Sequence, residues 1–181
     1  MNAELTVDDL KAKSPQELLE WMLSLRGGEF FAETCVHEAS HAVLAVLLGV
    51  PFDYVTVVPE LAESGDVLAG FIRWKNSDEM TKYIFHNWAL AAIAPQVALP
   101  LFGIEHTAEE DAEEFSTDEA LLSVLQRYKP DLSRPSLRER ARELLTPAVR
   151  MWVYRVAKEL QARKTLVPKE VLALRDENSI L

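Results

Sequence analysis

The chain has 181 residues, of which 49% are hydrophobic and 27% are charged, a balance that is ordinary for a soluble globular domain. The net charge of −10 argues against nucleic acid and against an anionic membrane surface as partners. A single cysteine, Cys35, excludes an internal disulfide and fits a reducing compartment, and the longest apolar run is too short to span a membrane. We therefore expect one cytoplasmic domain with no membrane segment.

Hydrophobic periodicity and turn signals divide the chain into several helices and one small sheet. The expected helices are residues 15–26, 29–48, 77–99, 118–128, 136–145, 147–164 and 168–175. Two β-rich runs, 52–60 and 67–74, flank a turn-like Glu-Ser-Gly-Asp segment, which is typical of a hairpin or small sheet. Pro95 is expected to kink or split its helix. The predicted fold class is therefore mainly α (α+β), with one small β-hairpin or sheet.

The domain organisation that these elements suggest is simple. Residues 1–28 are predicted to form an N-terminal helical extension, residues 29–176 the main domain, and residues 177–181 a C-terminal tail. No internal repeat or low-complexity tract interrupts this division. The candidate chemistry is therefore expected within the main domain.

An apolar helix carries two histidines and a glutamate at a characteristic spacing. His37 and His41 are four residues apart and so lie one turn apart on one helix face, with Glu38 beside them. In this H-E-x-x-H pattern two imidazoles bind one Zn²⁺, and the glutamate acts as general base. Titratable groups are costly to bury unless something pairs with them, and a metal ion would do so. Structural histidines at an accidental spacing are the competing interpretation; the helical context and apolar flanks favour zinc.

A catalytic zinc site needs a third protein ligand. Leu44 and Leu47 occupy the positions where a metzincin has glycine and histidine, which excludes that extension. Glu60 and Glu63 have the spacing of a thermolysin-like third ligand but fall in the predicted hairpin. The remaining acids cluster over 109–119, so the third ligand is sought there.

Several motifs follow one another in a familiar order. The stretches HEASHAVLAVLLG, VPFDYVTVVPE and LAGFIRW are followed by ALAAIAPQVALPLFG and VAKELQARKTLVPKEVLAL. This order resembles the peptidase domain of FtsH-type ATP-dependent zinc metalloproteases, with its HEAGHA helix, two following strands, small-residue helix and closing helix pair. The resemblance spans about residues 30–175, and the first motif is the specific one.

The resemblance implies a helical zinc endopeptidase domain whose third ligand is an aspartate. In that family the aspartate opens a later helix and has a threonine five residues after it. Asp118 follows Ser116-Thr117, which has the residue types of a helix cap, and has Ser123 five residues on. Asp111 competes with it but lies in a run of acids without a clear helix start. We favour Asp118 as the third ligand.

The same resemblance points to a substrate-binding strand. Zinc peptidases hold an extended peptide along an exposed strand edge beside the metal, and by resemblance this edge is Leu68, Ala69, Gly70, Phe71 and Ile72. An ordinary buried strand is the alternative interpretation. Because we expect no ATPase module in these residues, the substrates would be flexible peptides or exposed protein segments, including segments delivered by a separate unfoldase or adaptor protein.

Two positions depart from the family pattern. Ser40 replaces the motif glycine, and Gln96 stands where the family has a glutamate, which implies that one carboxylate near the site is missing. The expected function is that of an HExxH zinc metalloendopeptidase with Glu38 as catalytic base. The alternatives are a non-enzymatic interaction or regulatory module that keeps the fold, with or without the zinc, and a hydrolase acting on something other than peptides. The sequence does not predict the oligomeric state.

Overall fold

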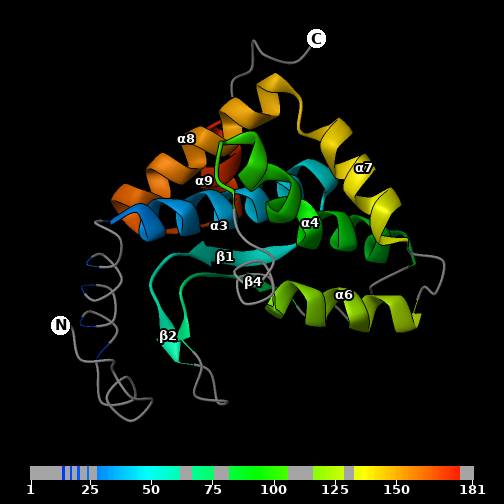
Figure 1. Ribbon diagram of the computed structural model, residues 1–181, viewed down its shortest axis with the longest axis horizontal. Helices are drawn as coiled ribbons and strands as arrows, with labels where there is room; N and C mark the ends of the chain where they lie inside the picture. Colours follow the sequence, from blue (N-terminus) through cyan, green and yellow to red (C-terminus); the bar gives the residue numbers. More distant parts are fainter. Residues whose placement is uncertain are drawn as a thin grey trace.

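The computed structural model of the chain describes residues 28–61, 67–75, 82–105, 116–128 and 133–175, together with Ser14, Glu17, Glu20 and Ser24. The elements, labelled as in Figure 1, are α3 (Glu29–Leu48), β1 (Phe52–Thr56), β2 (Glu60–Leu61), β3 (Val67–Leu68), β4 (Phe71–Trp74), α4 (Lys82–Leu101), α6 (Ser116–Tyr128), α7 (Arg134–Leu144), α8 (Pro147–Arg163), β5 (Thr165–Leu166) and α9 (Pro168–Ala173). These residues are mostly helical with a small three-stranded antiparallel sheet, which confirms the predicted mainly α (α+β) class. The predicted C-terminal tail and nearly all of the N-terminal extension lie outside them.

The main sheet has the order β4-β1-β5, with both outer strands antiparallel to β1. The pairing of β1 with β4 was expected, whereas β5 was not, because a two-residue strand has no periodicity that could reveal it. Val57 donates its N–H to the Lys164 carbonyl at 2.9 Å, and the Thr56 and Thr165 hydroxyl groups lie 2.8 Å apart. These contacts join the end of β1 to the residues that follow α8.

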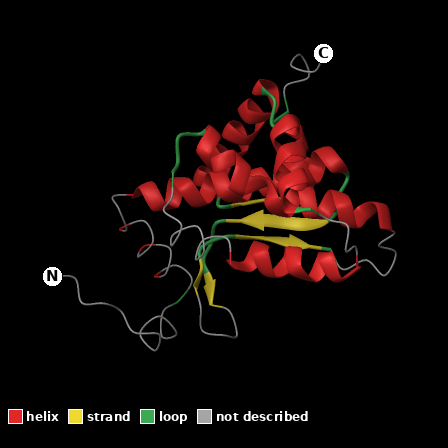
Figure 2. Ribbon diagram, turned by 45° about the vertical axis from the view of Figure 1, so that its right-hand side comes forward, coloured by secondary structure: helices red, strands yellow, loops and turns green. Residues whose placement is uncertain are grey.

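The helices surround the sheet unequally. α3 packs against α4 and α8, and α4 also contacts α6 and α7. Both ribbon views place α6 beside β4, on the opposite side of that strand from β1 (Figures 1 and 2). Among the described residues β4 pairs only with β1. The outer edge of β4 therefore faces the side on which α6 lies.

The helix that carries the H-E-x-x-H motif is a core helix. Residues along it, including Ala39, Ala42 and Leu44, are fully buried, so it lacks the continuous polar face of a surface helix. Gly49 ends it in a left-handed conformation, with φ of 70°. The N–H of Gly49 bonds the Val46 carbonyl, and the following N–H bonds the Ala45 carbonyl, as in a Schellman motif.

Among the described residues, α3 is the one helix whose length and composition would allow it to cross a membrane. In this fold, however, 67% of its apolar window is buried inside the protein. Its apolar surface is therefore largely used in packing against its neighbours α4 and α8.

Helix boundaries agree with the predictions for α3 and differ by a few residues elsewhere. α4 runs unbroken to Leu101, so Pro95 does not split it. α6 begins at Ser116, two residues before the predicted start, and α7 begins at Arg134 with Pro135 in its first turn. A proline is well tolerated there because the first helical N–H groups have no partner within the helix.

Candidate metal centre

The three residues of the H-E-x-x-H motif are buried together on α3. The exposed fractions of His37, Glu38 and His41 are 6%, 5% and 3%. The helical spacing brings the two Nε2 atoms of the histidines within 3.2 Å of each other. Two imidazole nitrogens at this separation in the buried interior require a proton or a cation between or beside them.

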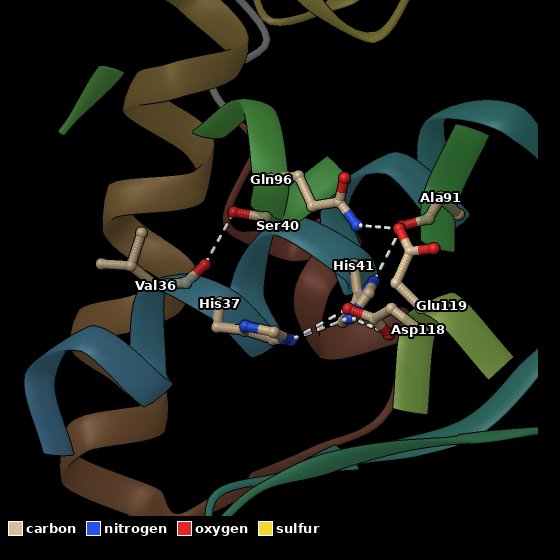
Figure 3. A network of polar contacts seen from close by, with 8 residues as sticks. All are labelled: Val36, His37, Ser40, His41, Ala91, Gln96, Asp118 and Glu119. Carbon is tan, nitrogen blue, oxygen red and sulfur yellow. Dashed lines mark hydrogen bonds and ion pairs between the residues drawn. The ribbon is translucent and has the colours of Figure 1, made fainter. Parts of the chain in front are cut away.

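Asp118 reaches this pair from the first turn of α6. Its Oδ1 lies 3.1 Å from His41 Nε2, its Oδ2 lies 3.4 Å from His37 Nε2, and the residue is buried. Figure 3 shows the two imidazole rings and the carboxylate pointing toward one another. The structure thus brings together the three predicted ligands, whereas the competing Asp111 lies outside the described residues. His37, His41 and Asp118 form a buried group that could hold a metal ion.

The three side chains lie close enough together to hold a small metal ion. A tetrahedral zinc with bonds of about 2.0–2.1 Å separates its ligand atoms by about 3.3 Å. The two Nε2 atoms lie 3.2 Å apart, and each approaches a different oxygen of Asp118: His41 Nε2 lies 3.1 Å from Oδ1 and His37 Nε2 lies 3.4 Å from Oδ2. With one ligand atom taken from each residue, all three lie within 4.8 Å of one another. In addition, Asp118 Oδ2 is buried and accepts no hydrogen bond from the described residues. A buried carboxylate oxygen of this kind is suited to a metal ion as its partner.

The orientation of His41 is fixed by a backbone carbonyl. Its Nδ1 lies 2.8 Å from the carbonyl oxygen of Ala91 on α4, in the buried interior (Figure 3). A carbonyl oxygen only accepts hydrogen bonds, so Nδ1 must carry the proton and donate it. The lone pair of Nε2 is then directed at His37 and Asp118, which is the arrangement a metal-binding histidine needs.

Opposing charges set the ionisation of the site. Burial alone would raise the pKa of Asp118, but the adjacent His41 and His37 rings outweigh burial and hold that pKa well below its usual range. For His41 the effects have the opposite sign. Burial alone would lower its pKa, but the Asp118 carboxylate outweighs burial, and the pKa of His41 is raised. The site therefore attracts one positive charge, either a proton or a cation. Because the two compete, binding of a metal ion would release protons.

The predicted substrate strand is divided in the structure: Leu68 ends β3, Ala69 and Gly70 form a bend, and Phe71 begins β4. The bend lies against Glu38. A Cβ atom added to Gly70 would lie 2.8 Å from Glu38 Cγ, 2.9 Å from the Thr56 carbonyl oxygen and 3.0 Å from Thr34 Cγ2. No other residue type fits there without displacing one of these groups. Gly70 thus lets the chain between β3 and β4 lie against Glu38.

Both departures from the resembled family are accommodated by hydrogen bonds. The Ser40 side chain is fully buried, and its hydroxyl donates to the Val36 carbonyl at 2.7 Å (Figure 3). Neighbouring helices therefore leave room for a hydroxyl where the family has a glycine, and the polar group is satisfied within α3 itself.

Gln96 joins three helices beside the site. Its Nε2 donates to Glu119 Oε1 at 2.9 Å, and its Oε1 accepts from the Arg138 Nε and Nη2 at 3.2 and 2.8 Å. Arg134 pairs with the second oxygen of Glu119. Since Glu119 directly follows Asp118, this network ties the start of α6 to α4 and α7. The resembled family has a glutamate at this position. Here a glutamate would repel the neighbouring Glu119 carboxylate, whereas the Gln96 amide donates a hydrogen bond to it.

Two groups at the site were not predicted from the sequence. One is the Ala91 carbonyl, whose involvement could have been suspected from Pro95 four residues later. The other is Trp74 at the end of β4, whose ring lies 6.2 Å from the His41 ring and 5.7 Å from that of Trp88, measured between centroids. Cys35, two residues before His37, is buried, and burial raises the pKa of its thiol to about 12.

Comparison of the chain with models of known protein families gives no match, and neither does comparison with curated proteins. The resemblance to FtsH-type peptidases therefore stays a prediction from the motifs. The site must be interpreted from its own residues.

Proposed function

We propose that this protein is a zinc-dependent metallopeptidase that hydrolyses peptide bonds in flexible peptides or exposed protein segments. The observation that carries the proposal is the convergence of two imidazole nitrogens and one carboxylate beside Glu38. Calcium and magnesium prefer shells of oxygen ligands, whereas zinc readily takes two histidines and a carboxylate. Non-haem iron accepts the same set, but the adjacent glutamate at the H-E-x-x-H spacing favours zinc.

The chain's own residues would divide the work as follows. His37, His41 and Asp118 would hold the zinc, which when bound supplies Lewis-acid chemistry that acidifies water and polarises a peptide carbonyl. Glu38 would accept the proton of the attacking water and later pass it to the leaving amine. Burial of Glu38, at 5% exposure, keeps bulk water from competing for that proton.

The outer edge of β4 supports a peptide as the substrate. Phe71 and Ile72 belong to β4, which pairs on one side only among the described residues, and Leu68, Ala69 and Gly70 lead into it. An extended peptide could add to such an edge through backbone hydrogen bonds. Because Gly70 touches Glu38, a peptide bound there would lie near the proposed base. A separate unfoldase or adaptor protein would be needed only for folded substrates.

Gly70→Ala is expected to lower peptide hydrolysis about a hundredfold while zinc stays bound. The new methyl group would meet Glu38 Cγ and the Thr56 carbonyl oxygen, and a shift of about 1 Å in a catalytic group can cost this much. His37 and His41 lie outside the contact, so zinc content serves as the internal control. Hydrolysis within threefold of the wild type would show that the close approach of Gly70 is not needed for the reaction.

Metal removal and replacement test the proposed function directly. Elemental analysis of the purified protein is expected to find about one zinc per chain. Treatment with a chelator should abolish cleavage of a peptide library, and stoichiometric zinc should restore it. Iron in place of zinc would contradict the assignment of the metal. Bound zinc without any cleavage would instead support the interaction-module alternative.

A further inference from the structure

A proline lies where a helix would normally form an unbroken ladder of hydrogen bonds. Pro95 sits within α4, and the helix continues past it to Leu101. In an α-helix each N–H donates to the carbonyl four residues before it. Pro95 has no N–H, so it cannot donate to the carbonyl of Ala91. That carbonyl lacks the donor that every other residue type would provide.

The carbonyl so released is the one that His41 uses. His41 Nδ1 donates to the Ala91 oxygen at 2.8 Å, and both residues are almost fully buried (Figure 3). Water is therefore not available to satisfy either group. The pyrrolidine ring also crowds the carbonyl of the fourth residue before it and turns it away from the helix axis. Here the carbonyl meets a ring nitrogen on α3.

We infer that Pro95 is a positioning residue of the metal centre, acting through the Ala91 carbonyl on the tautomer and orientation of His41. The inference rests on the metal site that the proposed function requires. A proline inside a helix is strongly destabilising, and Pro95 is buried in the core. The proline frees a buried acceptor of fixed position, and this gain offsets the cost of the lost helical hydrogen bond. Partners of this kind hold a metal-binding histidine in place.

The same helix provides a matched control. Pro100 also lies within α4, but the carbonyl four residues before it belongs to Gln96, and Pro100 is exposed. Pro95→Ala and Pro100→Ala therefore make the same chemical change in one helix, and only the first adds an N–H that competes for the Ala91 oxygen. Both changes give the helix a backbone donor, so both variants are expected to fold.

The test compares zinc affinity, measured by competition with a chelator, in the wild type and the two variants. Pro95→Ala is expected to weaken zinc binding about tenfold, and Pro100→Ala to leave it unchanged. An unaltered affinity in Pro95→Ala, within twofold of the wild type, would overturn the inference. So would an equal loss in both variants, because that would trace the effect to the helix as a whole.

A backbone ester separates the missing N–H from the proline ring. Lactic acid at position 95 has the side chain of alanine but no N–H, and it is expected to restore the affinity of the wild type. An affinity as weak as that of Pro95→Ala would assign the effect to the ring, which turns the same Ala91 carbonyl away from the helix axis, and would leave Pro95 as the positioning residue. In the zinc-loaded wild type, nitrogen-15 NMR is expected to find the His41 proton on Nδ1. A proton on Nε2 would overturn the inference, whatever the affinities of the variants.

The outcomes separate this inference from the proposed function. A wild type that binds no zinc would overturn both. Zinc binding and peptide cleavage that are both indifferent to Pro95→Ala would overturn the inference alone. Zinc binding that Pro95→Ala weakens, in a protein that cleaves no peptide, would leave the inference standing and overturn the proposed function.

Discussion

Glu38→Gln is expected to abolish peptide hydrolysis and to leave the zinc in place. The amide is close to the carboxylate in size, so it fills the same buried position against Gly70 without opening a cavity. It cannot accept a proton from the attacking water, and loss of a general base typically lowers the rate by about 10²–10⁴-fold. The measurement is the rate of cleavage of a fluorogenic peptide at equal zinc content.

The matched control is Glu29→Gln, the same substitution in the first turn of the same helix at an exposed position. It is expected to leave both zinc content and cleavage unchanged. Cleavage by Glu38→Gln within fivefold of the wild type would contradict the role of Glu38 as base. If neither the wild type nor Glu38→Gln cleaves any peptide although both hold zinc, Glu38 has a structural role, and the interaction-module alternative gains support.

The parts of the site that sequence predicted are those fixed by local geometry. His37 and His41 must share a face because they are four residues apart on a helix, and the structure brings their Nε2 atoms to 3.2 Å. Asp118 was favoured because the resemblance implies an aspartate at the opening of a later helix, and a ligand in the first turn of a helix has a well-defined position. The helix α3 itself was predicted to the residue, because Gly28 and Gly49 mark its two ends.

The parts that sequence did not predict depend on contacts between distant segments. β5 exists because Leu166 meets Val55 across the sheet, and nothing within 165–166 distinguishes a strand from a loop. Pro95 was interpreted as a kink or break in its own helix, whereas its consequence lies in another helix, at His41. Hydrophobic periodicity describes which face of an element is buried. It does not describe which neighbour that face meets.

The role of Gln96 also depends on contacts with distant segments. From the motif of the resembled family alone, the residue was interpreted as the loss of a carboxylate. In the structure the amide donates to Glu119 and accepts from Arg138 at once, and an ionised carboxylate could do only the second. The residue is therefore understood only together with its partners on α6 and α7.

Asp118→Ala is expected to lose zinc that the wild type retains through gel filtration. Four-ligand zinc sites bind with about 10–16 kcal/mol in total, so one ligand contributes about 2.5–4 kcal/mol and its removal weakens binding about 10²–10³-fold. The variant also removes the carboxylate that raises the pKa of His41 against the effect of burial, so that pKa is expected to fall. His37 and His41 alone would form a two-ligand site of low affinity.

Thermal unfolding gives the second measurement for this substitution, because a ligand that binds only the folded state stabilises it. Zinc at about 1,000 times its dissociation constant should stabilise the wild type by about 4 kcal/mol, and Asp118→Ala should show no such shift. Asp111→Ala serves as the control, since Asp111 is the competing candidate for the third ligand, and it is expected to keep both the zinc and the shift. Zinc lost from Asp111→Ala but kept by Asp118→Ala would reverse the assignment. Zinc kept by both variants would mean that the two histidines draw their third ligand from elsewhere, and the carboxylate beside them would then act on the metal centre only through its charge.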